Sequence, residues 1–391
     1  MKATRRSLTN AKVERIPASG IRRFFDLVSG TEGVISLGVG EPDFITPDRF
    51  RDAAIKSIKD GKTKYTSNYG ILPLREAISE HTAKLRGVRY DPAREILVTV
   101  GVSEAVDLAL RATLNDGDEV VIADPSYVAY VPGIVLAGGV PVAVPTDEAN
   151  GFRLLPDDVR KAITPRTRAI LLGFPNNPTG AVLEAEDVRG IAALAKEHDL
   201  LVYSDEIYDR LVYGAVHHSI LDEAGMKERT IYLAGFSKAY AMTGWRVGYA
   251  CAPAEIIEQM MKIHQYTVMC VPTAAQYAAL EAMRNGEAEV QRMVAEYDKR
   301  RRRMYERFNA MGLHCFEPRG AFYCFPNVTS TGLSDGEFCE RLLSEEKVVV
   351  VPGSAFGERG VGHVRACYAA SMEKIDTACD RIERFVGRQR H

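Results

Sequence analysis

The chain has 391 residues and lacks any apolar run long enough to cross a bilayer. Its first twenty residues are basic and rich in hydroxyl groups, but they contain no apolar segment of the kind that directs secretion. We interpret them as an N-terminal arm, with a transit peptide as the alternative. The net charge of −2 gives no broad attraction to nucleic acid or to a membrane surface, so we expect neither as a partner.

Cysteine and histidine patterns that indicate crosslinks or metals are also missing. The seven cysteines are odd in number and none forms a CxxC pair, which favours reduced thiols over a disulfide framework. The eight histidines are scattered, with His217 and His218 the only adjacent pair, and no HxxxH or Cys/His spacing suggests a metal site. We therefore expect a cytoplasmic protein without a metal ion.

The composition is that of an ordinary soluble protein, 46% apolar and 26% charged, and the length exceeds one core, so two domains are expected. From residue 96 apolar strands alternate with amphipathic helices, which is typical of an α/β fold with a mainly parallel sheet. Past residue 284 a long charged helix and fewer, antiparallel-looking strands indicate a smaller α+β domain. We place the arm and part of the small domain at residues 1–46, the large domain at 47–283 and the small domain at 284–391.

The expected helices cover residues 19–29 (with Ser19 as N-cap), 47–60, 72–85, 103–114, 126–138, 188–198, 286–312 and 371–386. The expected strands cover residues 34–37, 96–100, 119–125, 140–145, 169–175, 200–205, 231–235, 320–326, 348–356 and 362–369. Ligands on such folds bind outside the carboxyl ends of the strands, and several polar residues fall at those ends.

The most informative stretch is residues 231–249, IYLAGFSKAYAMTGWRVGY, in which Lys238 follows directly after a buried strand breaks. A lysine there is costly if it stays charged and unpaired, and a desolvated lysine amine can form a Schiff base with an aldehyde. Ser237 and Arg246 nearby suit an aldehyde that also carries a phosphate, as pyridoxal 5′-phosphate does. A plain surface position is the commoner outcome for a lone lysine.

Other residues near strand ends have a structural interpretation beside a functional one. Ser103 begins a helix, where free N–H groups bind anions, although a serine N-cap explains it equally well. Asp205 ends a buried strand, and it either pairs with a cation or caps the next helix. Tyr127 is either a packed aromatic or a stacking surface. Arg365 stands among apolar residues and needs a carboxylate, from a ligand or from a salt bridge.

The stretch SKAYAMTGWRVGY resembles the lysine signature of the class I and II aminotransferases, the aspartate aminotransferase-like enzymes of pyridoxal-phosphate fold type I. Further motifs are similar to family motifs in the same order: GEPDF at 40–44, TVGVSE at 99–104, DPSY at 124–127, NNPTG at 176–180, YSDEIY at 203–208 and GHVRACYA at 362–369. The resemblance extends over about residues 19–386. It implies a seven-stranded sheet in the large domain, pyridoxal 5′-phosphate as cofactor and a homodimer with shared active sites.

The resemblance also implies a role for each residue. Lys238 would be catalytic, first as the Schiff-base lysine and then as general base. Asp205 would keep the cofactor's ring nitrogen protonated, which makes the ring a better electron sink. The other cofactor contacts would be Val102, Ser103, Ser237 and Arg246 at the phosphate, Tyr127 on the ring face, Asn177 and Tyr208 at the ring oxygen, and Tyr65 at the partner subunit's phosphate. The substrate would be held by Gly40, Asn177 and Arg365.

The implied reaction moves an amino group from an L-amino acid to a 2-oxo acid such as 2-oxoglutarate with ping-pong kinetics. Two positions depart from the family: Gly235, where many relatives carry serine, and Ser103, where some members that prefer acidic substrates carry a basic residue. SGIRRFFD, HQYTVMC and VVVVPGSAFG resemble members of broad specificity acting on aromatic amino acids and N-acetyl-diaminopimelate. The donor is therefore aspartate, aromatic or related, with Arg22 and residues 264–270 as candidates for the side-chain pocket.

Two alternatives stay open on the same fold. A lyase or decarboxylase would share the cofactor site and differ only in the fate of the substrate carbanion. A cofactor-sensing DNA-binding regulator would need a further domain, and only about 20 residues precede the family region. The sole basic cluster, residues 299–303, is flanked by Asp298 and Glu306 and is better interpreted as a solvated helix face.

Overall fold

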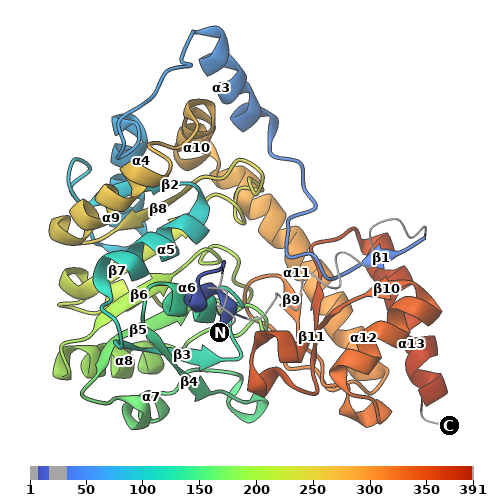
Figure 1. The fold of residues 1–391 in the computed structure, drawn as a ribbon. Helices are drawn as coiled ribbons and strands as arrows, with labels where there is room; N and C mark the ends of the chain where they lie inside the picture. Colours follow the sequence, from blue (N-terminus) through green and yellow to red (C-terminus); the bar gives the residue numbers. More distant parts are fainter. Residues whose placement is uncertain (1–7, 17–32, 390–391) are drawn as a thin grey trace, which may run out of the picture.

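The computed structural model describes residues 8–16 and 33–389. At its centre lies a seven-stranded sheet with the order β2-β8-β7-β6-β5-β3-β4 (Figure 1). Its strands are β2 (Ile96–Thr99), β3 (Glu119–Asp124), β4 (Val140–Pro145), β5 (Thr167–Gly173), β6 (Leu201–Asp205), β7 (Thr230–Gly235) and β8 (Gly248–Cys251). Only the pairings of β8 are antiparallel. The prediction of a mainly parallel seven-stranded sheet is confirmed.

Helices cover both faces of this sheet because its strands are apolar on both sides. In β3, Val120 and Ile122 belong to one core and Val121 and Ala123 to the opposite one. The first core is closed by α5 (Gly101–Thr113), α6 (Tyr130–Leu136) and α9 (Ala254–Thr267), and the second by α7 (Pro156–Ala162) and α8 (Ala185–Glu197). A further core lies under α3 (Asp48–Lys59), α4 (Leu72–Arg86) and α10 (Thr273–Asn285).

The C-terminal part packs beside the sheet, around a core of its own (Figure 1). Its helices are α11 (Glu287–Ala310), α12 (Asp335–Glu346) and α13 (Met372–Gln389), and its antiparallel sheet has the order β11 (Val351–Pro352), β12 (Val364–Cys367), β9 (Tyr323–Cys324). Strand β1 (Ile35–Ser36) pairs in parallel with β10 (Val348–Val349), so the start of the described main segment is held by the C-terminal part. The short helices are α1 (Ala11–Glu14), η1 (Glu148–Asn150), η2 (Ile220–Asp222), η3 (Lys227–Arg229), η4 (Thr329–Thr331), η5 (Gly353–Phe356) and η6 (Glu358–Gly360).

Several predicted boundaries are wrong, and tertiary contacts explain why. The helix expected at 126–138 begins only at Tyr130, and the Ser126 N–H before it donates to the Phe356 carbonyl. The strand expected at 320–326 shrinks to β9, since Ala321 has a φ of +56° and its N–H bonds to Leu211. The strand expected at 348–356 is divided into β10, β11 and η5. Strand β8 and helices α7, α9, α10 and α12 were not predicted.

Two further expectations concern the basic cluster and the helix expected near the N-terminus. The basic cluster at 299–303 on α11 is neutralised, with Arg300 bound to Asp43 at 2.7 Å and Arg303 to Asp376 at 2.6 Å. It therefore does not form a free cationic surface for nucleic acid. The helix expected at 19–29, with Ser19 and Arg22, lies outside the described residues.

The described residues contain no helix that is both long and apolar enough to serve as a membrane span. Across the same residues, no group of three or more histidine, cysteine, aspartate or glutamate side chains is arranged to hold a metal ion.

Candidate active site

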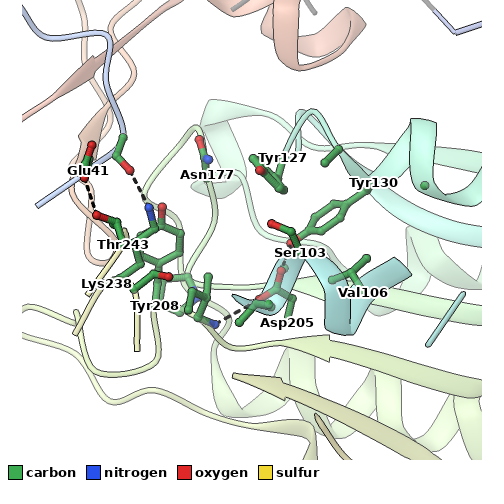
Figure 2. A pocket seen from close by; sticks show the side chains of 18 of the residues that line it. Glu41, Ser103, Val106, Tyr127, Tyr130, Asn177, Asp205, Tyr208, Lys238 and Thr243 are labelled. Carbon is green, nitrogen blue, oxygen red and sulfur yellow. Dashed lines mark hydrogen bonds between the residues drawn. The ribbon is translucent and has the colours of Figure 1, made fainter. Parts of the chain in front are cut away.

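A cavity of about 640 Å³ opens at the carboxyl ends of the central strands (Figure 2). Asp205 ends β6, Lys238 follows β7, and Ser103 lies in the first turn of α5 after β2, as the rule for open α/β sheets predicts. Most of the residues predicted for the site line this cavity. They are Gly40, Val102, Ser103, Tyr127, Asn177, Asp205, Tyr208, Ser237, Lys238, Arg246 and Arg365.

Tyr65 is the predicted cofactor residue that this cavity leaves out. Its side chain is 81% exposed and does not line the cavity of its own chain. The 264–270 segment, a candidate for the side-chain pocket, is also absent from the lining, and Tyr266 within it is 87% exposed. The exposed rings of Tyr65 and Tyr266 are therefore free to contact another molecule, as the resemblance implies for Tyr65.

The Lys238 amine is partly buried in the cavity wall. Its Nζ donates a hydrogen bond of 2.6 Å to the Gly40 carbonyl and lies 5.8 Å from the centre of the Tyr208 ring. Desolvation lowers the pKa of Lys238 to about 8, and the positive charges of Arg365 and Arg246 act in the same direction. A lysine held in this way is neutral in a useful fraction of molecules near neutral pH, which a nucleophile or a general base requires.

The Asp205 carboxylate is buried, and its two hydrogen bonds come from neutral donors. Tyr130 Oη donates to Oδ2 at 2.8 Å and the Ile207 N–H donates to Oδ1 at 3.2 Å (Figure 2). Desolvation raises the pKa of Asp205 to about 6, against the opposing effect of these hydrogen bonds. The carboxylate therefore fits a cationic partner in the cavity, such as a protonated ring nitrogen.

An anion site is formed where Arg246 meets the N-terminus of α5. A Cβ built on Gly101 would lie 2.6 Å from Nη2 of Arg246, so the guanidinium rests directly against the first residue of the helix. The same Arg246 side chain donates from Nη1 to the Thr243 carbonyl at 2.9 Å, which fixes its orientation. A helix N-terminus and a guanidinium that converge in this way, with the Ser103 and Ser237 hydroxyls on the cavity wall, suit a phosphate.

The structure explains why Gly235 replaces the serine of many relatives. A Cβ at Gly235 would lie 2.8 Å from Cγ2 of Val102 and 3.0 Å from Cα of Gly248. Both groups belong to the tight junction of β7, β8 and α5, which has little room to move. A side chain at 235 would therefore crowd Val102 and Gly248 at the start of α5 and β8.

Arg365 is buried, and its hydrogen bonds within the described residues leave its charge uncompensated. Nη1 donates to Oδ1 of Asn177 at 2.8 Å and Nη2 donates to the Gly38 carbonyl at 2.7 Å, both neutral oxygens. The guanidinium lies between the rings of Tyr323 and Phe356, 4.5 and 4.8 Å from their centres, and its buried Nε has no partner within the described residues. An arginine in a structural salt bridge would not have these features, and a ligand carboxylate would supply what is missing.

Two tyrosines at the site were missed by sequence reasoning. Tyr130 holds Asp205, and Tyr323 Oη lies 2.7 Å from Tyr208 Oη. A helical spacing of three residues after Tyr127 was a signal for Tyr130, but Tyr323 comes from a different part of the chain and had no local signal. Glu41 and Thr243, whose side chains bond to each other, also line the cavity; they lie inside the GEPDF and SKAYAMTGWRVGY motifs, but neither was assigned a role from the sequence.

The donor set as a whole fits pyridoxal 5′-phosphate. It offers an amine for the aldehyde, an anion site for the phosphate, a buried acid for the ring nitrogen and the Tyr127 ring beside them. The guanidinium of Arg365 lines the same cavity and is left for the substrate.

Comparisons with known proteins agree with this geometry. Residues 32–382 match the family model described as aminotransferase class I and II. The chain is 47% identical to an aromatic-amino-acid aminotransferase of Thermococcus litoralis and 47% identical to an aspartate aminotransferase of Pyrococcus abyssi, in each case over 96% of this chain and 97% of the relative. A solved structure of an aromatic aminotransferase from Pyrococcus horikoshii superposes with a TM-score of 0.90 at 46% identity, covering 94% of this chain and 99% of the other.

Proposed function

The chain belongs to the class I and II aminotransferases, a family of pyridoxal-phosphate enzymes, and we propose that it moves an amino group from an L-amino acid to a 2-oxo acid such as 2-oxoglutarate. The observation that carries this proposal is the convergence of a desolvated Lys238 amine, a buried Asp205 carboxylate and an uncompensated Arg365 in one cavity. Few other reactions need these three groups together.

Pyridoxal phosphate, when bound, supplies an aldehyde that takes up amino groups and a ring that withdraws electrons from the substrate α-carbon. Lys238 Nζ would be the amine that holds the aldehyde and, once released, the base that moves a proton from the substrate α-carbon to the cofactor carbon that carried the aldehyde. Its lowered pKa supports both tasks, because each needs the neutral amine. Asp205 holds the proton on the ring nitrogen, and Tyr130 keeps Asp205 oriented toward it.

The remaining residues orient the reacting groups. Arg365 grips the substrate α-carboxylate, and Gly40, whose carbonyl accepts from Lys238, lies beside that carboxylate. Asn177 Oδ1 is occupied by Arg365, which leaves its amide N–H groups to donate to the cofactor's ring oxygen together with the Tyr208 hydroxyl. Tyr127 stacks on the ring. The phosphate is held by Arg246, Ser103, Ser237 and the free N–H groups at Val102 and Ser103.

A single carboxylate site supports a ping-pong order. The amino donor and the 2-oxo acceptor both carry an α-carboxylate next to the reacting carbon, so both would use Arg365 in turn. The donor is aspartate, an aromatic amino acid or a related amino acid. Two relatives of equal identity are named for aromatic donors and for aspartate, so overall similarity does not choose between them.

We also propose a homodimer in which Tyr65 reaches the partner subunit's phosphate. Its exposure supports this role, as do the exposed Tyr266 and Met269, which a second subunit would cover. The division into residues 1–46, 47–283 and 284–391 belongs to the same proposal, with the cavity between the two larger parts. The seven cysteines are all unpaired, which supports a cytoplasmic location.

A half-reaction screen tests the proposal. The cofactor-saturated protein is mixed with single amino acids, and the absorbance of the bound cofactor and the products are followed. We expect the absorbance to change and one 2-oxo acid to form per site with aspartate, with aromatic donors or with both, and no turnover in Lys238→Ala. Release of ammonia or CO₂ instead would identify a lyase or a decarboxylase on this fold.

A further inference from the structure

Tyr323 is a buried cavity residue to which the reaction as described assigns no task. It lies on β9 and lines the same cavity as Asp205 and Lys238, with 1% of its surface exposed. Its hydroxyl is 2.7 Å from the hydroxyl of Tyr208, and its ring lies 4.5 Å from the guanidinium of Arg365. One side chain thus contacts both the group expected at the cofactor's ring oxygen and the group expected at the substrate carboxylate.

The direction of the bond between the two tyrosines follows from the number of protons. Each phenol has one proton to donate and two lone pairs that accept. If Tyr208 donates to the cofactor's ring oxygen, its proton is used, and its oxygen can only accept from Tyr323. If Tyr323 accepted instead, Tyr208 would have no proton left for the ring oxygen. Donation by Tyr323 is therefore the arrangement that leaves Tyr208 able to act.

A donor behind Tyr208 also makes Tyr208 a better donor. Hydrogen bonds in a chain polarise one another, and the effect is larger in a buried site. Burial of both phenols raises the pKa of Tyr323 and of Tyr208, so both keep their protons at working pH. Both hydrogen bonds, from Tyr323 to Tyr208 and from Tyr208 to the ring oxygen, then keep the same donor-to-acceptor direction.

The Tyr323 hydroxyl fits beside Gly40 because position 40 has no side chain. A Cβ on Gly40 would lie 2.2 Å from Tyr323 Oη, so a residue with a side chain at position 40 would push the hydroxyl away from Tyr208. The Tyr208 ring is packed edge-on against Phe322, the residue before Tyr323, with 5.4 Å between ring centres. Both tyrosines are therefore fixed by packing as well as by their mutual bond.

We propose that Tyr323 is a positioning residue whose hydroxyl donates to Tyr208 and fixes Tyr208 as the donor to the cofactor's ring oxygen, while its ring supports Arg365. This inference rests on the proposed function of the cavity. It assigns two separable tasks to one side chain, because the hydroxyl acts on Tyr208 and the ring acts on Arg365.

The test is a pH titration of the absorbance that arises when Lys238 and the cofactor are joined. A hydrogen bond donated to the ring oxygen favours the unprotonated chromophore, in which that oxygen is negative, so a weaker donor raises the chromophore's pKa. Tyr323→Phe should shift this pKa upward by a few tenths of a pH unit, on the order expected for a bond strengthened through a chain. Tyr208→Phe should shift it further, and Tyr208→Phe/Tyr323→Phe should match Tyr208→Phe alone.

A matched control separates this effect from a general loss of packing. Tyr213 is also buried, and its hydroxyl donates to the Ala321 carbonyl at 2.7 Å outside the cavity. Tyr213→Phe should leave the chromophore's pKa unchanged. Tyr323→Leu, which removes the ring as well, should raise KM for both the amino acid and the 2-oxo acid several-fold, whereas Tyr323→Phe should leave both KM values within about twofold of wild type.

The outcomes are distinguishable from failure of the proposed function. If wild-type protein forms the chromophore at Lys238 but Tyr323→Phe titrates as wild type does, the positioning role is wrong and the proposed function stands. Shifts that add in the double variant would also overturn it, because Tyr323 would then act independently of Tyr208. If the wild-type protein forms no chromophore, the proposed function itself is wrong.

Discussion

The Tyr130 hydroxyl donates a hydrogen bond of 2.8 Å to Oδ2 of Asp205, and both side chains are buried. Tyr130 is the first residue of α6, and Asp205 is the last residue of β6. A Cβ at Gly173 would lie 2.4 Å from this hydroxyl, so glycine at the end of β5 leaves the room that Tyr130 needs. Burial raises the pKa of Asp205 to about 6, and the bond from Tyr130 opposes that rise.

The first prediction concerns Tyr130→Phe. Without the bond, the pKa of Asp205 rises further and the carboxylate is a poorer partner for a protonated ring, so cofactor binding should weaken about 10-fold, the size expected for a hydrogen bond to a charged group. Because the pKa of Asp205 is raised in the folded protein, ionising it lowers stability as pH rises from about 4 to about 6. The variant should therefore lose more stability above pH 6 than at pH 4, which urea unfolding of the cofactor-free protein measures.

Tyr203→Phe is the matched control for this change. Tyr203 lies on β6, the strand that also carries Asp205, and it is fully buried. Its hydroxyl is 2.6 Å from Thr113 Oγ1, and its side chain does not line the cavity. Its loss should leave cofactor affinity unchanged. Equal effects of the two substitutions would contradict the special role of Tyr130.

The second prediction concerns Lys238→Met in the cofactor-free protein. Burial lowers the pKa of Lys238 to about 8 from 10.5, so the unfolded chain binds more protons than the folded one between these values. The charged amine destabilises the fold below pH 8, and this cost is relieved as pH rises through 8 to 10.5. The stability of wild type should therefore rise relative to that of Lys238→Met over this range, as measured by urea unfolding at pH 7, 8.5 and 10. A constant difference would show that Lys238 is not desolvated.

The third prediction concerns Arg365→Lys. A lysine cannot reproduce the planar fork of donors or the stacking between Tyr323 and Phe356. We expect KM to rise by roughly 10- to 100-fold for the amino acid and by a similar factor for the 2-oxo acid, since a hydrogen bond to a charged group contributes about 1.5–3 kcal/mol. Steady-state kinetics with both substrates varied measures this.

Arg301→Lys is the control for Arg365. Arg301 is also buried and lies over a tyrosine ring, 5.5 Å from the centre of Tyr213, but its partners Asp298 and Glu317 are structural. This variant should lose stability and keep both KM values. If Arg365→Lys raised KM for the amino acid alone or for the 2-oxo acid alone, the two substrates would not share one carboxylate site.

The fourth prediction concerns Gly235→Ser, which introduces the residue found in many relatives. The added atoms would crowd Val102 and Gly248, so we expect a loss of about 1–3 kcal/mol of stability and weaker cofactor binding, despite the extra hydroxyl. Thermal unfolding and cofactor titration measure both. Gly336→Ser on α12, where a Cβ would meet nothing within 4 Å, should be nearly neutral. Tighter cofactor binding in Gly235→Ser would show that the turn adapts.

The sequence predicts that several of the residues that line the cavity lie near one another, because they follow strand ends. Asp205 and Lys238 follow apolar runs, and the α/β rule places such positions along one edge of the sheet. Tyr323 could not be found in that way, because it comes from a two-residue strand more than 80 residues beyond Lys238 and approaches from the other side. The segment before α6 likewise contacts a distant part of the chain, since the Ser126 N–H bonds to Phe356 of the C-terminal part, and such contacts have no local signal in the sequence.

The account depends most directly on the bond between Lys238 and the cofactor. Cofactor-saturated protein is reduced with borohydride, digested and mapped by mass spectrometry. We predict that the reduced cofactor's mass is found on the peptide that contains Lys238, and that Lys238→Ala carries none. Recovery of the label at another lysine, or of an unlabelled Lys238 peptide from fully saturated protein, would contradict the account.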